Sequence, residues 1–464
     1  MNPPRPETKS AKISSNFKTE NAPPLLSKKA YQYPTEIILE LPEFLPLETV
    51  YGKNIKNITK ITEKFKGRML TYQTHGLYVY PAKFIPQIPQ FCIREFSKPH
   101  DVILDPFCGS GTTLVEALLL KRNAYGLDIN PLAQLISKVK TIPLDLQQLS
   151  KECRSLDQFL STNPASLNST EEIPSFPNLI YWFAPNTLQE LVKLQRYIFN
   201  IPDPAIQNLF RLILASIIRD ISLADNDQLH PARTKFARQN KPVNLSTYES
   251  FRKALIPRLS SMESFSQFDF SDVSVQIIGE DATKINCPQK VDLAVTSPPY
   301  VNALDYVRIH KLEAFWTGLL SPEQISPLQR KFIGTDRIYR ESYQNSPHFS
   351  NDELNSLISQ IAIFDKKRAG IVAMYFVRMF ENLREVYRLL RPKGYYCIVI
   401  GANTIRNIHI PTPKILISYA EEELGYENIM NYSYDIINKR LKIPRASHGG
   451  DIKKEWIIIL QRKS

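Results

Sequence analysis

The stretch Val291-Asp292-Leu293-Ala294-Val295-Thr296-Ser297-Pro298-Pro299-Tyr300 decides how this chain of 464 residues is organised. Residues 291–295 form a short apolar run around one acid, which predicts a buried strand of a parallel sheet. Because Pro298 and Pro299 lack a backbone N–H, they cannot continue a sheet ladder, and the chain must leave the sheet there as a stiff loop. Residues 297–300 therefore lie at the carboxyl end of a strand, where open α/β sheets bind their ligands.

The loop from Ser297 to Tyr300 has the composition of a pocket for an amino group. Its two prolines leave carbonyl oxygens without matching N–H donors, and the Ser297 hydroxyl can also accept a hydrogen bond. Such a pocket suits an exocyclic –NH2 group, and Tyr300 offers a flat face against which an extruded base can stack. The alternative is an ordinary Pro-Pro turn with Tyr300 as packing, because a four-residue match is a weak signal on its own.

A second loop, Asp105-Pro106-Phe107-Cys108-Gly109-Ser110-Gly111-Thr112-Thr113, follows an apolar segment that we expect to be the first core strand. Gly109 and Gly111 permit a sharp turn and a close approach to a ligand. The two threonines are good N-caps for the helix predicted over residues 114–120, and free N–H groups at a helix start favour a carboxylate or phosphate. The loop lacks the Gly-Lys-Ser/Thr ending of a P-loop and the third glycine of a dinucleotide-binding fingerprint.

Acidic residues near this loop fit an adenosyl ligand. Asp128 ends the strand predicted over residues 123–127 and is placed to bond ribose hydroxyls. Asp281 follows a strand predicted over residues 274–279 and is placed to accept from an adenine amino group, while Asp105 is placed to take a methionine ammonium group. For each acid the alternative is a loop-end carboxylate that caps the next helix.

The segment 105–113 followed by the segment 297–300 resembles the amino-directed DNA methyltransferases, which use S-adenosylmethionine. Ser-Pro-Pro-Tyr is most typical of the branch that makes N4-methylcytosine. Tyr80-Pro81-Ala82-Lys83-Phe84 resembles the His-Pro-x-x-Phe segment of that family, with tyrosine in place of the usual histidine. The resemblance covers roughly residues 75–140 and 271–464, with the cofactor loop first and the catalytic loop second.

The resemblance implies an α/β fold with a doubly wound, seven-stranded Rossmann-like methyltransferase sheet. It implies transfer of a methyl group to the N4 amine of a flipped cytosine in double-stranded DNA, without a covalent enzyme intermediate. The catalytic residues are then Ser297, Pro298, Pro299 and Tyr300. The cofactor-binding residues, with the acids above, are Pro81, Phe84, Asp105, Phe107, Gly109, Ser110, Gly111, Thr112, Asp128 and Asp281.

Two other functions stay open at this point. The same loops serve enzymes that methylate the N6 amine of adenine in DNA, or an exocyclic amine in RNA. A protein of another class, a non-catalytic nucleic-acid-binding protein that keeps the fold, is the third alternative, although a protein freed from catalysis need not keep both loops.

Composition divides the chain into four segments. Residues 1–30 are rich in Pro, Lys, Ser and Asn, which predicts a disordered basic arm. Residues 31–140 hold an N-terminal extension and the first part of the methyltransferase domain, and residues 271–464 hold its second part. Between them, residues 141–270 predict a mainly helical insertion, which we expect to take part in target recognition, with a structural lid as the alternative.

Local patterns add specific predictions. Thr187 and Glu190 form a capping-box pattern, and residues 209–221 are apolar nearly all round, which predicts a buried helix. Residues 321–352 are polar and carry Arg330, Lys331, Arg337 and Arg340, which predicts a long loop or a small excursion that can touch DNA. Residues 391–394, Arg-Pro-Lys-Gly, are a stop-and-turn signal after a helix. The last two strands are expected to form a hairpin that places the final strand antiparallel.

Charge and cysteine content limit the class of protein. The net charge of +12 and the pI of about 9.2 favour a nucleic-acid partner. No run of eighteen apolar residues occurs, so no membrane span is expected. The five cysteines show no CxxC pair, which predicts reduced thiols in the cytoplasm and no metal site. A cognate restriction endonuclease is a candidate partner.

Overall fold

The computed structural model describes residues 55–57, 70–162, 174–240, 245–301, 303–344, 347–436 and 452–464, with only the backbone described at 55–57, 236, 237 and 240. The arm predicted over residues 1–30 lies outside this part of the chain.

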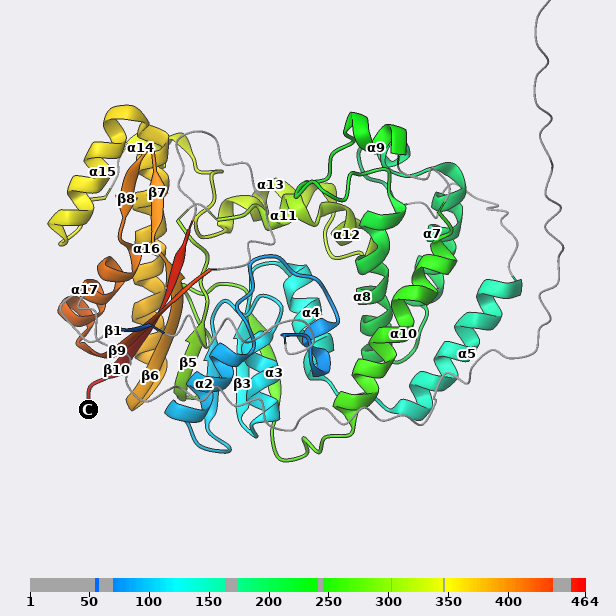
Figure 1. Ribbon diagram of the computed structural model, residues 1–464, viewed down its shortest axis with the longest axis horizontal. Helices are drawn as coiled ribbons and strands as arrows, with labels where there is room; N and C mark the ends of the chain where they lie inside the picture. The colour runs from blue at the N-terminus through cyan, green and yellow to red at the C-terminus, as the bar shows by residue number, and fades with distance from the viewer. Residues whose placement is uncertain are drawn as a thin grey trace, which may run out of the picture. The chain divides into compact units, whose positions relative to one another are not determined.

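A mixed sheet forms the centre of the described structure (Figure 1). Its order is β1-β9-β10-β6-β5-β2-β3-β4. Neighbouring strands are parallel except at β10, which runs antiparallel to both β6 and β9, as predicted for the final hairpin. The strands are β1 (Ile55–Asn57), β2 (Val102–Asp105), β3 (Asn123–Leu127), β4 (Val275–Gly279), β5 (Val291–Thr296), β6 (Leu390–Gly401), β9 (Tyr426–Asp435) and β10 (Lys454–Arg462).

The predicted doubly wound sheet is confirmed, and the short edge strand β1 extends it from seven strands to eight. Numbered by their order in the chain, the seven strands from β2 onward lie as 3-2-1-4-5-7-6. A separate hairpin, β7 (Asn403–Ile405) and β8 (Ile408–Ile410), follows β6. The strand order reverses between β2 and β5, which is where open α/β sheets place a ligand.

Helices cover both faces of the sheet (Figure 1). On one face α2 (Gln87–Phe96) and α3 (Thr112–Leu119) pack against it, followed by α4 (Pro131–Thr141); on the other lie α16 (Lys366–Leu389) and α17 (Thr412–Leu424). Within β5, Leu293 and Val295 pack toward α2 and α3, while Ala294 packs toward α16. Burial of both faces explains why this strand is a continuous apolar run.

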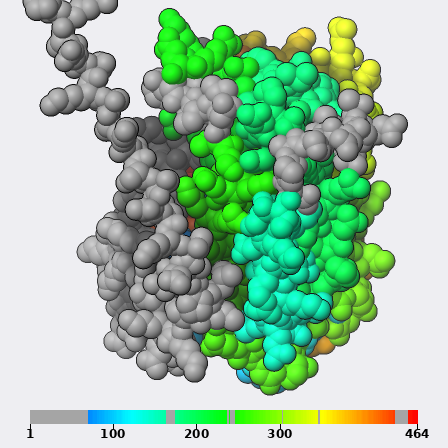
Figure 2. All heavy atoms as spheres, turned by 90° about the vertical axis from the view of Figure 1, so that its right-hand side faces the viewer, coloured from blue at the N-terminus to red at the C-terminus, as the bar shows by residue number. Residues whose placement is uncertain are grey.

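The segment between β3 and β4 is helical, and in Figure 2 it faces the viewer in cyan to green. It contains α5 (Leu146–Thr162), α6 (Leu179–Trp182), α7 (Pro185–Phe199), α8 (Pro204–Ile221), α9 (Lys235–Asn240) and α10 (Thr247–Ser266). The helix predicted over residues 209–221 lies within α8, and its apolar side chains are buried, as predicted. No helix of the described residues is long and apolar enough to span a membrane.

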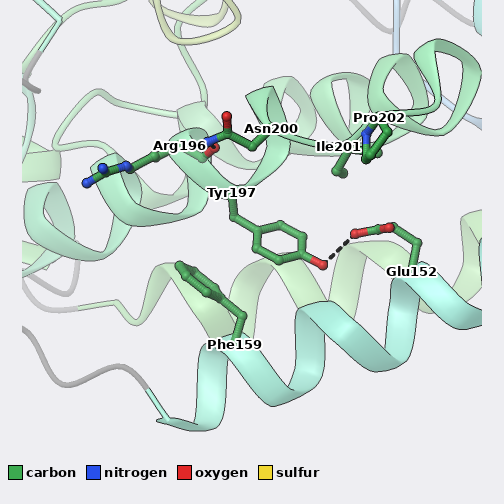
Figure 3. A pocket seen from close by; sticks show the side chains of 7 residues that line it. All are labelled: Glu152, Phe159, Arg196, Tyr197, Asn200, Ile201 and Pro202. Carbon is green, nitrogen blue, oxygen red and sulfur yellow. Dashed lines mark hydrogen bonds between the residues drawn. The ribbon is translucent and has the colours of Figure 1, made fainter.

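A pocket on this helical segment lies apart from the predicted site residues (Figure 3). Figure 3 shows the Tyr197 hydroxyl of α7 reaching the Glu152 carboxylate of α5, at 2.5 Å. Phe159 packs against the Tyr197 ring with centroids 4.8 Å apart. These contacts join α5 to α7, so the pocket is a feature of helix packing.

The N-caps predicted for α3 were wrong. The N-cap is Gly111, in the left-handed conformation at φ +74°, and Thr112 and Thr113 are the first two helical residues. Both threonines are buried, and the Thr113 hydroxyl lies 3.4 Å from the Val295 carbonyl of β5. The positive φ turns the chain into the helix early, so neither threonine is the N-cap, and the Thr113 side chain faces the sheet.

The capping box predicted at Thr187 and Glu190 was also wrong. Helix α7 begins at Pro185, which is favoured at a first helical position, so both residues lie within the helix. Glu190 instead accepts from the Thr247 N–H at 2.6 Å and from the Ser246 hydroxyl at 3.1 Å. These two residues start α10, so Glu190 caps a helix distant in sequence.

Two further local predictions differ from the structure. The segment 321–352, predicted as a long loop or a small excursion, contains α13 (Pro322–Lys331) and α14 (Arg340–Gln344). Helix α13 starts with a capping box of Ser321 and Gln324. Helix α16 ends at Leu389, as the stop signal predicted, but residues 391–394 do not form a turn between the helix and the strand. They form an irregularity inside β6, whose pairing with β5 jumps from Val291–Leu390 to Leu293–Tyr395.

Candidate active site

The two loops singled out in the sequence meet at the carboxyl ends of β2 and β5. These strands are parallel neighbours, with Ile103 opposite Leu293. The Thr296 hydroxyl, at the end of β5, donates a 2.5 Å hydrogen bond to Asp105 Oδ1 at the end of β2. The glycine loop and the Ser-Pro-Pro-Tyr loop therefore start from two side chains that are bonded to each other.

The glycine loop is shaped by two left-handed residues. Gly109 has φ +50° and Gly111 has φ +74°. A Cβ on Gly111 would lie 2.9 Å from the Ser137 hydroxyl oxygen of α4 and 3.0 Å from its Cα, so only glycine fits. The Ser137 hydroxyl also donates to the Gly109 carbonyl at 2.9 Å. The loop is thus held tightly between α3 and α4 while its backbone stays free of side chains.

Asp105 is fully buried but only half satisfied. Its Oδ1 accepts from Thr296 and, at 3.1 Å, from the Phe107 N–H, while Oδ2 has no hydrogen-bond partner in the described part of the chain. Burial raises the pKa of the Asp105 carboxyl to about 6, against the lowering effect of hydrogen bonds with Thr296, Thr113 and the Phe107 N–H. The Ser110 hydroxyl, also buried, has no partner among the described residues either. Buried polar atoms are rarely left unpaired, so the arrangement fits a polar ligand.

Asp128, after β3, completes the acidic side of the site. Its Oδ2 accepts from the Gly109 N–H at 2.9 Å and its Oδ1 from the Asn130 N–H at 2.8 Å. Burial is the main cause that raises its pKa to about 6. Asp128 therefore both closes the glycine loop and remains a second carboxyl beside it.

An aromatic stack lies next to these acids. Tyr80 accepts a 3.0 Å hydrogen bond from the Asn130 amide. Its ring stacks on Tyr306, with centroids 5.4 Å apart and planes 4° from parallel, and on His310, at 5.5 Å and 13°. The stack joins the segment before α2 to the segment after the Ser-Pro-Pro-Tyr loop.

The Ser-Pro-Pro-Tyr loop is fixed at its far end by a carboxylate. Ser297, Pro299 and Tyr300 are half-buried and Pro298 is buried. The hydroxyl groups of Tyr300 and Tyr434 donate to the two oxygens of Glu455 on β10. Burial, followed by the negative charge of Glu455, raises the pKa of both tyrosines, so both hydroxyls stay protonated as donors.

Known proteins match this chain in both of its motif-bearing halves. A family model described as DNA methylase, N6_N4_Mtase, matches residues 8–138. The Type II methyltransferase M.MvaI of Kocuria varians is 27% identical over 421 residues, which cover 84% of this chain and 91% of that protein. M.BsoBI of Geobacillus stearothermophilus, another Type II methyltransferase, is 24% identical over 438 residues and covers 82% of this chain and 85% of its own length.

The family model and these relatives support an amino-directed DNA methyltransferase. S-adenosylmethionine is the methyl donor of that family, and the unpaired Asp105 Oδ2 and Ser110 hydroxyl, beside two glycines without side chains, fit it. A solved rRNA methyltransferase, aviRa from Streptomyces viridochromogenes, aligns over 83% of this chain and 88% of its own at 10% identity and a TM-score of 0.24, which adds nothing to the strand order.

Three of the residues predicted for the methyltransferase site have mainly packing contacts in the structure. Phe84 and Phe107 are half-buried and pack against the apolar clusters on the two faces of the sheet. Pro81 is half-buried just after Tyr80. His310, which stacks on Tyr80, was missed as a member of the site because an aromatic stack between distant segments leaves no local pattern.

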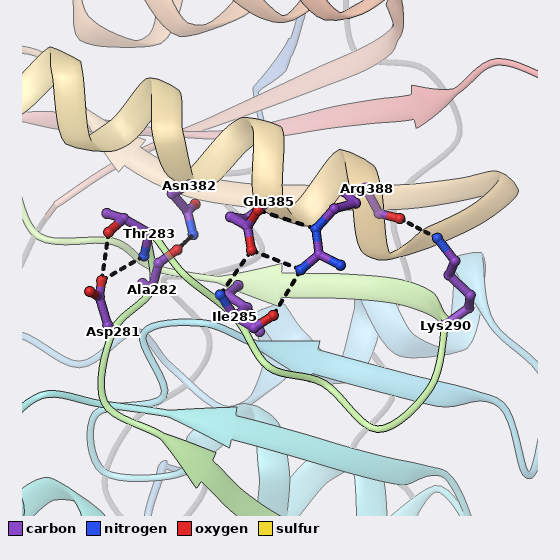
Figure 4. A network of polar contacts seen from close by, with 8 residues as sticks. All are labelled: Asp281, Ala282, Thr283, Ile285, Lys290, Asn382, Glu385 and Arg388. Atoms are coloured by element: carbon purple, nitrogen blue, oxygen red, sulfur yellow. Dashed lines mark hydrogen bonds and ion pairs between the residues drawn. The ribbon is translucent and has the colours of Figure 1, made fainter.

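Asp281 is placed differently from the other acids. It is exposed, and its Oδ1 accepts from the N–H of Thr283 at 2.9 Å and from the Thr283 hydroxyl at 2.6 Å. Figure 4 shows how the loop after it is held on α16: the Asn382 amide donates to the Ala282 carbonyl at 2.8 Å. The Ile285 N–H donates to Glu385 at 2.9 Å. Asn382 and Glu385 were not predicted from the sequence.

Proposed function

We propose that this methyltransferase moves a methyl group to the exocyclic N4 amine of cytosine in a base flipped out of double-stranded DNA. The observation that carries the proposal is the bonded pair of loops: Ser-Pro-Pro-Tyr after β5 lies beside the glycine loop after β2, joined through Thr296 and Asp105. A donor held by the glycine loop and an amine held by the prolines would then lie next to each other.

On the cofactor side, the proposed contacts come from the two buried acids and from the backbone of the glycine loop. Asp105 Oδ2, buried and without a partner among the described residues, would take the ammonium group of the methionine part. Asp128 would hold the ribose hydroxyls. The N–H groups of Ser110 and Thr112, at the start of α3, would hold the carboxylate, since the Gly111 N–H already donates to the Cys108 carbonyl at 2.7 Å. When bound, S-adenosylmethionine supplies a methyl group activated by a sulfonium.

The adenine end is the more open part of the proposed cofactor site. Asp281 would accept from the adenine amine through Oδ2, because Oδ1 is used by Thr283. The loop that carries Asp281 is held on α16, which fixes where that carboxylate stands. Pro81, Phe84 and Phe107 would add apolar wall, by resemblance to the family.

On the base side, the Ser297 hydroxyl and the Pro298 carbonyl would accept the two hydrogens of the target amine. Neither proline has an N–H, so Ser297 and the carbonyls can orient the amine without a competing backbone donor. Tyr300, with its hydroxyl tied to Glu455, would present its ring to the flipped base. Holding both reactants in line supplies most of the rate, and no covalent bond to the protein is needed.

The relatives suggest a biological setting. M.MvaI and M.BsoBI are Type II methyltransferases by name, and they align over most of this chain. On that likeness we propose that this enzyme belongs to a restriction-modification system with a cognate endonuclease. We also keep the proposal that residues 141–270 take part in target recognition, between the parts of the methyltransferase domain in residues 31–140 and 271–464.

The test is transfer of labelled methyl from S-adenosylmethionine to unmethylated duplex DNA, followed by nucleoside analysis. We expect N4-methylcytosine from the wild type and loss of it in Ser297→Ala, while cofactor binding by the variant stays intact. N6-methyladenine as the product would support the proposed site but would show that the target base is adenine and not cytosine. Full activity in Ser297→Ala would remove Ser297 from the proposed mechanism.

A further inference from the structure

The segment from Ser321 to Gln344, which we call the excursion, returns to the Ser-Pro-Pro-Tyr loop after leaving it. Its helix α13 contacts the short helix α11 (Tyr306–Ile309) that follows the loop. The Gln329 amide of the excursion donates a 2.6 Å hydrogen bond to Asp305 Oδ2. Asp305 is the N-cap of α11, so the bond ties the excursion to the end of the catalytic loop.

A second contact lies closer to the proposed base pocket. Gly334, at φ +77°, accepts from the Ala303 N–H at 3.3 Å through its carbonyl. A Cβ on Gly334 would lie 2.3 Å from the Tyr300 carbonyl oxygen and 3.0 Å from the Ala303 Cβ. The excursion backbone therefore packs directly on the backbone of Tyr300, with no room for a side chain between them.

The exposed side chains of the excursion, which we call its outer face, include four cations, three acids and one aromatic ring. Tyr339 is 58% exposed, and the Arg330 guanidinium lies 4.8 Å from its ring centroid. The exposed cations of this face are Arg330, Lys331, Arg337 and Arg340. The excursion also contains the acids Glu323, Asp336 and Glu341.

The ion pairs of these cations are weak enough to exchange. Lys331 lies 4.0 Å from Glu280 with its side chain 62% exposed, and Arg337 lies 3.6 Å from its neighbour Asp336 at 53% exposed. Exposed pairs of this kind contribute little to stability. A phosphate that displaced the acid would gain a charge-assisted contact and release counterions.

We propose that the outer face of the excursion binds the sugar–phosphate backbone of duplex DNA next to the flipped base, and that its contacts with Tyr300, Ala303 and Asp305 couple this binding to the catalytic loop. The inference rests on the proposed function as a DNA methyltransferase but not on which base is methylated. It assigns a docking role to a segment between the catalytic loop and α15 (Asp352–Phe364), outside the helical insertion.

The docking part is tested by binding of a labelled mixed-sequence duplex at several salt concentrations, followed by fluorescence anisotropy. Arg337→Ala and Arg340→Ala should each weaken binding and lower the slope of log affinity against log salt by about 0.9, the value for one lost phosphate contact. The control Lys98→Ala removes an exposed charge just before β2, at the opposite edge of the sheet, and should leave the slope unchanged. Slopes of the two arginine variants equal to that of Lys98→Ala would overturn the proposal.

The coupling part is tested by Gly334→Ala, with Gly425→Ala as the matched control. Gly425 has nearly the same φ, +76°, but a Cβ there would meet only the Tyr387 hydroxyl at 3.7 Å. Gly334→Ala should lower the single-turnover rate of methyl transfer about 100-fold, as a displaced catalytic loop would, with S-adenosylmethionine affinity unchanged. Gly425→Ala should keep the rate, because it bears the same backbone strain away from the loop.

The outcomes separate this inference from the proposed function. A normal rate in a folded Gly334→Ala protein would overturn the coupling. Methylation of adenine together with the expected salt slopes would change the target base and keep the docking face. Normal methylation of cytosine, with salt slopes that neither arginine variant alters, would support the proposed function and overturn the docking role. The outer face would then bind another partner, such as a protein.

Discussion

The Thr296 hydroxyl donates a 2.5 Å hydrogen bond to Asp105 Oδ1 across the two strands at which the sheet order reverses. Both side chains are fully buried, and the other oxygen of Asp105 has no partner among the described residues. The bond therefore holds a buried carboxylate in one orientation, with its free oxygen available for a ligand. Because Thr296 immediately precedes Ser297, the same bond also fixes where the catalytic loop begins.

Thr296→Val tests this bond, because valine keeps the shape and removes the donor. We expect the free energy of unfolding to fall by about 1–3 kcal/mol, the cost of leaving a buried acceptor without its donor. The pKa of Asp105 should rise further, since the Thr296 bond lowers it. Weaker S-adenosylmethionine binding should follow, measured by calorimetry, with denaturant unfolding for stability.

The matched control is Thr412→Val. Thr412 is equally buried, but its hydroxyl has no hydrogen-bond partner in the described part of the chain. Valine there should leave stability unchanged or raise it, because an unpaired buried hydroxyl is removed. If Thr296→Val and Thr412→Val lowered the free energy of unfolding equally, the bond to Asp105 would contribute nothing specific to stability.

The pKa values of about 6 at Asp105 and Asp128 predict that cofactor binding depends on pH. An ammonium ligand and ribose hydroxyls need the ionised carboxylates, so affinity for S-adenosylmethionine should rise as pH increases through 6. Below that pH the affinity should fall about tenfold per pH unit for each carboxyl that must ionise. Calorimetry between pH 5 and pH 7.5 measures this, and a flat profile would contradict it.

The stability of the ligand-free protein should change in the opposite direction. Each carboxyl has a pKa near 3.8 when unfolded and about 6 when folded, so the folded state holds its protons more tightly. The resulting contribution to stability is complete below pH 3.8 and is lost as pH rises through 6. In Asp105→Asn the pH-dependent stability that Asp105 contributes should disappear, and affinity for S-adenosylmethionine at pH 7 should fall.

The strands of the sheet, and the side of the sheet at which β2 and β5 end, could be predicted from the sequence because each depends on a local pattern. A strand buried on both faces is apolar along its whole length, as in β2 and β5, and Gly109 and Gly111 mark the turn that follows β2. The carboxyl ends of neighbouring parallel strands lie at the same side of the sheet, so Asp105 and Ser297, each predicted at a strand end, lie at that side.

Contacts between segments distant in sequence could not be predicted from local patterns. Thr296 and Asp105 are separated by 191 residues, and Tyr300 and Glu455 by 155. Which threonine or glutamate makes such a bond depends on side-chain placement in the folded chain and leaves no pattern in the sequence. Helix α13 is a different case, because Ser321, Pro322 and Gln324 form a readable helix start that the polar composition obscured.

Glu455 is expected to act as a positioning residue for Tyr300. Glu455→Ala would leave the hydroxyls of Tyr300 and Tyr434 without their acceptor, and the Tyr300 ring would lose its anchor on β10. We expect kcat for DNA methylation to fall with S-adenosylmethionine affinity unchanged. Glu455→Gln keeps one acceptor oxygen and should recover much of the activity.

Tyr434→Phe separates this positioning role from a purely structural one. It removes the second donor to Glu455 while leaving the Tyr300 bond in place. Its kcat should stay close to that of the wild type, even though thermal stability falls. If Tyr434→Phe and Glu455→Ala lowered kcat equally, the carboxylate would serve the packing of β9 and β10 and not the orientation of Tyr300.

Glu190 should stabilise the start of α10 although it belongs to α7. Its carboxylate accepts from the Thr247 N–H and the Ser246 hydroxyl, so Glu190→Ala removes charge-assisted bonds worth about 1.5–3 kcal/mol. Hydrogen exchange should therefore speed up at the Thr247 amide. The control Gln189→Ala changes the neighbouring side chain of the same helix and should leave this amide protected. Unchanged exchange in Glu190→Ala would mean that the Ser246 hydroxyl, which accepts from the Glu249 N–H, is sufficient as the cap.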